Sequence, residues 1–592
     1  MFPRYKKTLA LHPADVTVQC VLMLLSMVAG CPDSTSSKHP SSNLSPDASN
    51  TGLGRDAGPR TPADGSTFDA YVVTLDGATD AAAIVDAGAT KSGDWIQASF
   101  DVRGSVHNAA EHTLSPENVS RLTLLWRFDD QAAGHAIGPV HASPVVQDGR
   151  AYIGALGGRF YALERDGTAR WQYDTRPAKN PFASPRGSLG LSVTSPIAGA
   201  AVLALEDGLV IFGDEDGNVY ALDRETGVER WVKEDMDGNL FSGLIGNSIT
   251  IVDSTVYVGF SSVEAVGVAI GLISNYECCS FRGMIVALDV RSGQERWRYY
   301  TVPAAQALAI ERLPYRLGPS GGAIWGPPTY DAETRTLFVG TGQNFSPMPD
   351  GHGSTGSDSI LALDADTGQL KWSYQATQDD VWDVTRANPD AQGNYYDLDF
   401  GDSPKLYDLP GIGHVVGAGQ KSGAYHILRA SDGRLVSRTQ LIQMGLELGG
   451  FQNLGGYADG VVYQHGVDRV GPAVKDAPYV GTVLALDPDG THVRWRFDRP
   501  QSPFAGGIAI ANDVVYVQSP VEEADGGAPE GAIYALHAET GAQLARLPSA
   551  GRAVASMVVS NGRVYVGGGN GAVPDIGLDN VGSLSCYGLP TE

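Results

Sequence analysis

The feature that most constrains the fold is a short sequence ending that recurs six times along the chain. Each copy has an apolar run ending in Ala-Leu, then a polar turn containing Gly, and five copies place a Trp shortly after that turn. The copies lie at residues 160–171, 219–231, 285–297, 360–372, 483–495 and 533–541. Each copy fits a strand, a turn and a second strand, and repeats of four short strands are typical of β-propellers. The repeat therefore predicts an all-β chain that grows by adding blades around one axis.

We expect eight blades in one ring. Their strands are assigned to residues 138–173, 194–232, 248–299, 324–375, 402–439, 453–497, 505–547 and 553–587. The last blade is one strand short, and residues 122–128 look like a repeat ending without a beginning. This N-terminal strand is expected to complete the eighth blade and close the ring, which leaves no exposed sheet edge. The repeated Trp should dock on the neighbouring blade, less tightly in blades five and seven, where Ser437 and Ala545 replace it.

The chain before the propeller is predicted to be an export signal and a tether. Residues 1–31 combine a basic start, an apolar stretch and a small-residue sequence before Cys31, a pattern that resembles a bacterial lipobox. The alternative is an ordinary signal peptide in which Cys31 is incidental. Residues 32–92 are rich in Ser, Pro, Asp and Gly, which predicts a disordered arm. Residues 93–592 form the propeller, so we expect an exported lipoprotein facing the periplasm or the cell surface.

Charge and cysteine usage exclude some classes of function. The formal net charge of −25 disfavours nucleic acid, which is bound by basic surfaces. The five cysteines include no Cys-x-x-Cys-His sequence, so no haem is attached covalently, and no spacing indicates zinc. If the protein is a redox enzyme, it must therefore pass electrons to a separate carrier.

The Ala-Leu-Asp-x-x-Thr-Gly-x-x-x-Trp signature resembles the repeat of pyrroloquinoline quinone (PQQ) propellers. That family includes quinoprotein alcohol dehydrogenases, polyvinyl-alcohol dehydrogenase and cofactor-free outer-membrane assembly lipoproteins, so the repeat alone does not decide function. Residues 318–383 are more specific. They contain Gly-Gly-x-x-Trp ending at Trp325, Gly-x-Gly before Gln343-Asn344, and Asp-x-Trp-Asp ending at Asp383, in an order similar to the quinoprotein alcohol dehydrogenase core.

This resemblance implies roles for four of these residues. Trp325 would be a flat floor beneath the planar quinone, although a Trp packed between blades is the alternative. Asp383 would be the general base and a calcium ligand, although a turn Asp is the alternative. The family places an Asn calcium ligand where this chain has Gln343 followed by Asn344, so either amide could serve.

The same resemblance extends to the segment before Trp325. Glu264 would supply a calcium-binding carboxylate, with a solvated loop acid as the alternative. An insert then leads to Cys278-Cys279 and Arg282, an arrangement similar to the polyvinyl-alcohol dehydrogenase branch. The resemblance implies a disulfide between Cys278 and Cys279 near the quinone and places Arg282 on the cofactor side; two free thiols are the alternative. Export favours oxidation of such a pair.

Lys421 completes the candidate set. It stands two residues before Gly423, where the family has a Lys or Arg that bonds the quinone oxygens; an exposed turn Lys is the alternative. The favoured hypothesis is a PQQ- and calcium-dependent dehydrogenase of an alcohol, secondary or polymeric, with an external acceptor such as a cytochrome c. The second hypothesis is a lipid-anchored scaffold without cofactor. The third, a polysaccharide hydrolase or lyase, lacks any carboxylate pair with readable spacing.

Overall fold

In the computed structural model, residues 88–592 belong to one compact unit, and all of the described residues lie within it. The described residues are 93–179, 194–234, 236, 242–244, 246, 248–262, 264, 279–303, 319–348, 352–381, 397–443, 449–469, 479–500, 502, 504, 506–522, 530–549, 555–570 and 579–590. The predicted signal, Cys31 and the tether therefore lie outside the description and stay predictions. Within it, no helix has the length and apolar character needed to cross a membrane.

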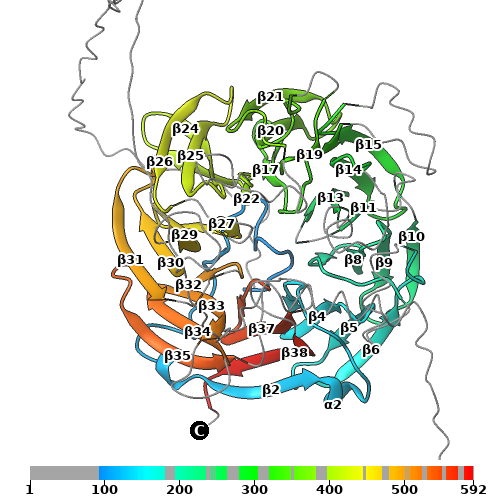
Figure 1. Ribbon diagram of the computed structural model, residues 1–592. Helices are drawn as coiled ribbons and strands as arrows, with labels where there is room; N and C mark the ends of the chain where they lie inside the picture. Colours follow the sequence, from blue (N-terminus) through cyan, green and yellow to red (C-terminus); the bar gives the residue numbers. More distant parts are fainter. Residues whose placement is uncertain are drawn as a thin grey trace, which may run out of the picture. The chain divides into compact units, whose positions relative to one another are not determined.

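The described chain forms eight blades, each an antiparallel sheet of four main strands, arranged around a ring in Figure 1. Blades one to four are β3 (Val145–Gln147), β4 (Arg150–Ala155), β5 (Arg159–Leu163) and β6 (Ala169–Asp174); β7 (Val202–Ala204), β8 (Leu209–Gly213), β9 (Val219–Asp223) and β10 (Glu229–Lys233); β12 (Ile249–Val252), β13 (Thr255–Ser262), β14 (Met284–Asp289) and β15 (Glu295–Tyr300); and β17 (Thr329–Asp331), β18 (Thr336–Gly340), β20 (Ser359–Asp364) and β21 (Leu370–Gln375).

The second half of the ring repeats this pattern. Blades five to eight are β23 (Lys405–Leu409), β24 (Gly413–Gly419), β25 (Ala424–Arg429) and β26 (Leu435–Gln440); β28 (Gly456–Ala458), β29 (Val461–Arg469), β30 (Tyr479–Leu486) and β31 (Val493–Pro500); β32 (Ala509–Ala511), β33 (Val514–Glu522), β34 (Glu530–His537) and β35 (Gln543–Ser549); and β36 (Val558–Ser560), β37 (Arg563–Asn570), β38 (Asp579–Gly588) and β2 (Thr123–Asp129). The additional elements are β1 (His107–Asn108), β11 (Ser242–Gly243), β16 (Ser320–Gly321), β19 (Asn344–Ser346), β22 (Gly401–Asp402), β27 (Gly450–Asn453), the 3-10 helix η1 (Val119–Arg121) and the helix α2 (Asp130–Ala133).

The predicted ring closure is confirmed. Strand β2 pairs antiparallel with β38, so a strand from the start of the described chain is the outermost strand of the last blade. Trp126 lies opposite Cys586, which is a buried free thiol. Because the first and last parts of the propeller share one sheet, the ring is held at this point by backbone hydrogen bonds between its two ends.

The repeated Asp-x-x-Thr-Gly sequence forms the turn between the third and fourth strands. In blade two, Asp223 Oδ1 accepts hydrogen bonds from the backbone N–H of Thr226 (2.9 Å) and from its hydroxyl (2.8 Å). Gly227 follows with φ +70°, in the left-handed region where glycine is favoured. The Asp thus fixes the turn through its side chain, and the Gly lets the chain reverse into the next strand.

The repeated Trp docks on this turn of the next blade, as predicted. In each case the indole covers the turn glycine, where an added Cβ would lie 2.5–2.6 Å from an indole carbon, and its Nε1 donates to a turn carbonyl at 2.7–3.1 Å. The pairs are Trp126 with Gly167, Trp171 with Gly227, Trp231 with Gly293, Trp297 with Gly368, Trp372 with Gly433, and Trp495 with Gly541. Blade-to-blade contact therefore depends on one bulky side chain and one missing side chain in each repeat.

The two positions without Trp differ from each other. Ser437 in blade five keeps the hydrogen bond, because its hydroxyl donates to the carbonyl of Asp489 in the turn of blade six at 2.7 Å. Ala545 faces blade eight, whose third and fourth strands, β38 and β2, are not consecutive in the chain and so share no turn. The missing indole at Ala545 therefore coincides with the seam of the ring, where η1 contacts β35 instead.

Residues 95–108 pass along the innermost strands of all eight blades in order. Each blade is held by at least one hydrogen bond between this segment and a residue within its innermost strand. The pairs, in blade order, are Trp95–Val146, Ile96–Leu203, Gln97–Ile251, Val102–Tyr330, Arg103–Leu406, Ser105–Tyr457, Val106–Ile510 and Asn108–Val559. The segment thus links every blade to one continuous stretch of chain on the axial side of the ring.

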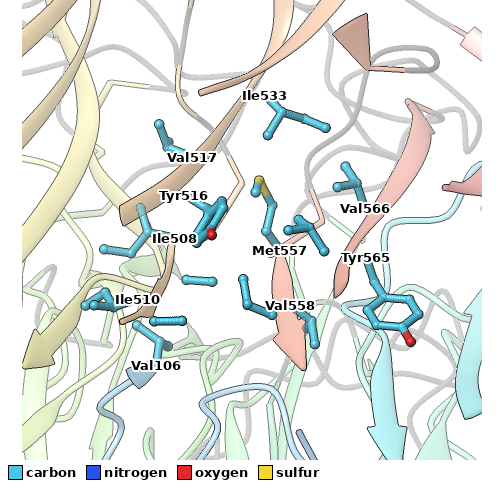
Figure 2. Packing of buried hydrophobic residues seen from close by; sticks show 14 of the residues in the cluster. Val106, Ile508, Ile510, Tyr516, Val517, Ile533, Met557, Val558, Tyr565 and Val566 are labelled. Carbon is cyan, nitrogen blue, oxygen red and sulfur yellow. The ribbon is translucent and has the colours of Figure 1, made fainter. Parts of the chain in front are cut away.

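The apolar core fills the spaces between adjacent blades and this segment. Figure 2 shows Val106 of the segment among side chains of blades seven and eight, with Ile510, Tyr516, Met557 and their neighbours. The inner strands are buried on both faces, whereas the outermost strands alternate between half-buried and exposed residues. Burial therefore decreases from the inner strands to the outermost strands, and the loops that carry the candidate residues begin at the buried inner strands.

We expect Trp231→Ala to destabilise the protein by roughly 3–5 kcal/mol, the usual cost of truncating a large buried aromatic side chain. The indole of Trp231 is 9% exposed and also donates to the carbonyl of Val290. Urea unfolding followed by circular dichroism measures the loss. Ser437→Ala, which removes a hydrogen bond but no indole, should cost about 1 kcal/mol. Equal losses in the two variants would contradict the docking role of the indole.

Candidate functional site

The candidate residues follow the second strand of three adjacent blades. Glu264 comes after β13, Gln343 after β18 and Lys421 after β24. Loops that leave equivalent strands of neighbouring blades emerge on the same face of a propeller ring. Trp325 precedes β17 and lies beside blade three, where its backbone carbonyl is 2.5 Å from the position of a Cβ on Gly246. The ring therefore brings side chains that are distant in sequence to one face.

Lys421 and Trp325, both predicted from the sequence, are brought together. The Lys421 ammonium lies 5.4 Å from the centre of the Trp325 ring, within cation–π range. It also contacts both carboxylate oxygens of Asp397 at 3.0 Å and Asp399 Oδ1 at 2.9 Å. Burial lowers the pKa of Lys421, but the two carboxylates raise it by more, so the net shift is upward and the ammonium stays charged.

Two further carboxyl groups make this region strongly acidic. Asp358 is fully buried, has a left-handed backbone (φ +49°), and neither of its carboxyl oxygens has a hydrogen-bond partner among the described residues. Burial first, then Asp380 and Asp399, raise the pKa of Asp358 well above its usual value. Burial raises the pKa of Asp380 to about 6. Four carboxyl groups thus accompany one ammonium, and a buried excess of this kind favours protonation or a further cation.

The other predicted metal ligands are already engaged to different degrees. Glu264 is fully buried; its carboxylate accepts from the backbone N–H of Ser280 (2.8 Å) and Phe281 (2.9 Å) and from the Ser280 hydroxyl (3.0 Å). Asn344 donates its amide N–H to Ser320 and accepts at its amide oxygen from the Ser354 N–H. Both ends of the Asn344 amide are therefore used within the fold.

Arg282 and Cys279 lie close together at the end of the insert. The Arg282 guanidinium donates to the carbonyl of Val302 at 2.7 and 3.0 Å and lies 4.0 Å from the centre of the Tyr300 ring. Cys279 is disulfide-bonded. Since Cys586 is free, the disulfide partner of Cys279 is one of the three cysteines outside the described residues. The pairing of Cys279 with Cys278 stays a prediction. Asp383 also lies outside them, so the predicted base has no described position.

The described residues contain no preformed metal cage. No group of three or more His, Cys, Asp or Glu side chains among them has the spacing to hold an ion. Among the described residues, none hydrogen-bonds the side-chain amide of Gln343, which is 6% exposed, so Gln343 is the amide of the predicted pair that is left for a cation. A calcium site in this region would need ligands from outside the described residues or from the bound cofactor.

Sequence reasoning did not single out Asp358, Asp397 or Asp399. The chain has 67 acidic residues, and no motif precedes Asp397 to distinguish it from the others. The only sequence feature that could have indicated a site here is the Asp-x-Asp spacing directly before Phe400-Gly401. That spacing is also common in turns, so it does not distinguish a functional site from a turn. What distinguishes these residues is burial beside Lys421, a property that depends on the meeting of two loops.

With this geometry established, similarity to known proteins decides the family. The model described as "Glucose/ethanol/alcohol dehydrogenase, beta-propeller domain" matches residues 95–440. The chain belongs to the PQQ-dependent alcohol dehydrogenase type of propeller. A second model, described as "Outer membrane protein assembly factor BamB", matches residues 480–579. The family assignment and the eight-bladed fold predicted from the repeat are thereby confirmed.

Individual relatives are more distant. The polyvinylalcohol dehydrogenase of Sphingopyxis sp. (strain 113P3) is 31% identical over 409 residues, covering 65% of this chain and 56% of the relative. The quinohemoprotein alcohol dehydrogenase of Comamonas testosteroni is 28% identical over 378 residues, covering 60% and 48%. The solved structure of the latter superposes with a TM-score of 0.64 at 22% identity, over 85% of this chain and 82% of that one. The chain spans about half the length of these curated relatives, and the structural likeness shows the fold.

The buried carboxyl group of Asp358 generates a prediction about pH. Its pKa is raised in the folded state, so the folded protein binds a proton that the unfolded chain releases above about pH 4. Stability from this group is therefore lost as pH rises above that value. The unfolding temperature of Asp358→Asn minus that of the original protein should become more positive between pH 4.5 and 7.5.

The exposed Asp366, paired with Arg335 at 2.5 Å, is the matched control. Its pKa is lowered by Arg335, so it contributes stability above its unfolded pKa. The same difference for Asp366→Asn should be flat or become more negative over this range. Parallel slopes for the two variants would contradict a buried protonated Asp358.

Proposed function

We propose that the protein oxidises an alcohol with PQQ bound against Trp325 and passes the electrons to an external acceptor. The observation that carries the proposal is the ammonium of Lys421 beside the indole face of Trp325, in a buried region built by loops of adjacent blades. A flat aromatic surface next to a fixed cation suits a planar, anionic quinone. Membership of the quinoprotein alcohol dehydrogenase type of propeller supports the same conclusion.

The described residues fit PQQ as a ligand. PQQ is a planar tricarboxylic acid, and when bound it supplies an electron pair acceptor for the oxidation of alcohols. Trp325 would stack on one of its faces, and Lys421 would donate to a quinone oxygen, which becomes more negative on reduction. Arg282 is held by Val302 and Tyr300, so it would orient the segment that carries Cys279 rather than reach the quinone freely.

Calcium dependence is the second part of the proposal. Bringing an anionic cofactor into a region with four carboxyl groups and one ammonium requires additional positive charge. Glu264, Gln343 and Asp383 are the residues that would hold the ion, because carboxylate and amide oxygens are the ligands calcium prefers. Glu264 would have to coordinate the ion through the same carboxylate oxygens that accept hydrogen bonds from Ser280 and Phe281.

Substrate, acceptor and location are proposed from the relatives and the sequence. A relative named polyvinylalcohol dehydrogenase supports a secondary or polymeric alcohol. A relative named methanol dehydrogenase [cytochrome c] supports a cytochrome c as acceptor. The lipobox-like sequence before Cys31 supports an exported, lipid-anchored protein facing the periplasm or cell surface.

A cofactor-free scaffold is the alternative. It is favoured by the match of residues 480–579 to the assembly-factor model. That match runs from β30 of blade six to β37 of blade eight, whereas the Lys421 and Trp325 region lies in blades three to five. A scaffold would not require a lysine and four carboxyl groups buried beside an indole, and we therefore favour the enzyme.

We expect the purified protein to bind PQQ in the presence of calcium, measured by quenching of tryptophan fluorescence. The loaded protein should reduce an artificial dye with a secondary alcohol, and a chelator should abolish this activity. Binding of PQQ without calcium at equal affinity would contradict the calcium requirement. Absence of PQQ binding under all conditions, together with capture of a partner protein, would favour the scaffold.

Lys421→Met should weaken PQQ binding by roughly 10–100-fold, because a hydrogen bond to a charged group contributes about 1.5–3 kcal/mol. The methionine preserves the length of the side chain but leaves Asp397 and Asp399 without their counter-ion, so folding is checked by circular dichroism. Lys371→Met is the matched control, since Lys371 is exposed and bonds turn atoms of blade four. Equal affinities of Lys421→Met and the original protein would contradict a role of Lys421 in binding.

A further inference from the structure

A second buried ion pair is close in sequence to the one that holds Lys421. The side chains of Asp402 and Lys405 are both 1% exposed, and Lys405 Nζ donates to Asp402 Oδ2. Nζ also donates to the carbonyl of Ser403 at 3.0 Å and lies 5.8 Å from the centre of the Tyr425 ring. Replacing a buried ion pair by apolar side chains of similar volume often leaves stability unchanged or raises it. The pair is therefore better explained by the groups that it holds in place than by a gain in stability.

The Asp402 carboxylate joins blades five and six. Besides Lys405, its Oδ2 accepts from the backbone N–H of Gly419 at 2.9 Å and from the side-chain amide of Gln464 at 2.8 Å. Its Oδ1 accepts from the backbone N–H of Gly455 at 2.9 Å. Gly419 ends β24 of blade five, Gln464 lies in β29 of blade six, and Gly455 directly precedes β28 of the same blade. Hydrogen bonds to an ionised acceptor are about twice as strong as neutral ones, so this carboxylate fixes the two blades firmly.

The same carboxylate connects two short segments that carry the candidate site. Asp399 lies three residues before Asp402, and Lys421 lies two residues after Gly419. At one end of these segments, the backbone N–H of Lys421 donates to the carbonyl of Asp399 at 3.0 Å. At the other end, Gly419 donates to Asp402. The two segments are thus connected at both ends, and the second connection depends on the Asp402 side chain.

Blade six closes the other side of Lys421. Strand β22, which contains Asp402, pairs parallel with β27, the strand that begins at Gly450. A Cβ on Gly450 would lie 2.0 Å from the carbonyl oxygen of Lys421. A Cβ on Gly419 would lie 2.6 Å from the Cβ of Phe451. Because the backbone is in direct contact on this side, a displacement of Gly419 is transmitted to Lys421 instead of being absorbed by free space.

We propose that Asp402 is a positioning residue that sets the ammonium of Lys421 beside Trp325. Lys405 serves as the counter-ion of this buried carboxylate. Asp402 acts through the backbone of Gly419 and not by contact with a ligand. The consequence for PQQ binding rests on the proposed function, whereas the position of Lys421 is a property of the chain itself. The two parts can therefore be tested separately.

The test uses the double substitution Asp402→Leu with Lys405→Met in the full chain. Leucine has the branched shape of aspartate but no acceptor oxygen, so the bonds from Gly419, Gly455 and Gln464 are lost. Both charges are removed together, because burial already lowers the pKa of Lys405 and the Asp402 carboxylate opposes that shift. A buried ammonium without its counter-ion would destabilise the fold. Circular dichroism shows whether the variant is folded, and urea unfolding gives its free energy of unfolding.

The readout is acetylation of Lys421 by acetic anhydride in the protein without cofactor, measured by mass spectrometry relative to Lys371 of the same molecule. The Lys421 side chain is 9% exposed and bound by two carboxylates, so this ratio should be low in the original protein. The double variant should raise it about 10-fold beyond the labelling that its own free energy of unfolding explains, because the site opens locally. Its affinity for PQQ, measured by fluorescence quenching, should fall about 10-fold, since the ammonium is displaced but not removed.

Lys405→Met alone separates the carboxylate from the ion pair. It leaves the three N–H donors of Asp402 in place, so the labelling ratio should stay within about twofold of the original value. The exposed pair of Arg335 and Asp366 supplies a matched double variant, Asp366→Leu with Arg335→Met. Loss of an exposed ion pair has little effect, so this variant should change neither the labelling ratio nor the affinity for PQQ.

Every outcome bears on the proposal. If the double variant does not fold, Asp402→Glu replaces it, because this substitution keeps both charges and moves the carboxylate by one methylene group; the same rise in labelling is expected. An unchanged ratio in the folded variant overturns the positioning role of Asp402, and so does an equal rise in Lys405→Met. If the labelling changes as expected but the original protein does not bind PQQ, the proposed function fails and the positioning of Lys421 stands.

Discussion

The contact on which the ring depends is an indole resting on a glycine of the next blade. Each copy combines close packing, which any Cβ at the glycine would prevent, with a hydrogen bond from Nε1 to the turn carbonyl. Because the same contact recurs around the ring, neighbouring blades meet in the same way at each junction that has it. The one junction with neither an indole nor a polar substitute, at Ala545, is the seam, where the neighbouring blade has no turn to receive it. The Trp of the repeat is thus absent at the junction where the neighbouring blade is assembled from the two ends of the chain.

The repeated contact between blades also fixes the positions of the side chains in the candidate site. Lys421, Trp325 and Asp399 come from loops, which by themselves define geometry poorly. They are held because the loops leave inner strands that are buried on both faces and docked on their neighbours. Burial then changes the chemistry of the groups. The same carboxylate that would be an ordinary acid on the surface has its pKa raised to about 7 at Asp399, with an ammonium within 3 Å.

The fold could be predicted from the sequence because its information is local and repeated. Most repeats carry the Asp and Gly of the turn and the Trp of the outer strand in their own sequence. Residues 122–128 resemble a repeat ending, which predicted their position as the outer strand of the last blade. The site was predictable only in part. Trp325 and Lys421 stood in recognisable motifs, and the structure brings them together. Asp397 and Asp399 carry no motif, since what matters about them is proximity to a lysine 22 to 24 residues away and exclusion of water, neither of which spacing can encode. Asp358 is similar, because only the structure shows that neither of its carboxyl oxygens has a hydrogen-bond partner in the described part of the chain.

The path of residues 95–108 has a consequence for how the protein is made. This stretch leaves the ribosome before any blade, yet its hydrogen-bonding partners are spread from Val146 to Val559, and the partner of β2 is the last strand of the chain. Contacts between such distant residues form late and slowly. The earliest part of the propeller must therefore remain without its native hydrogen-bonding partners until nearly the whole chain has been synthesised. Any holding factor that protects the chain during synthesis would need to cover this stretch the longest.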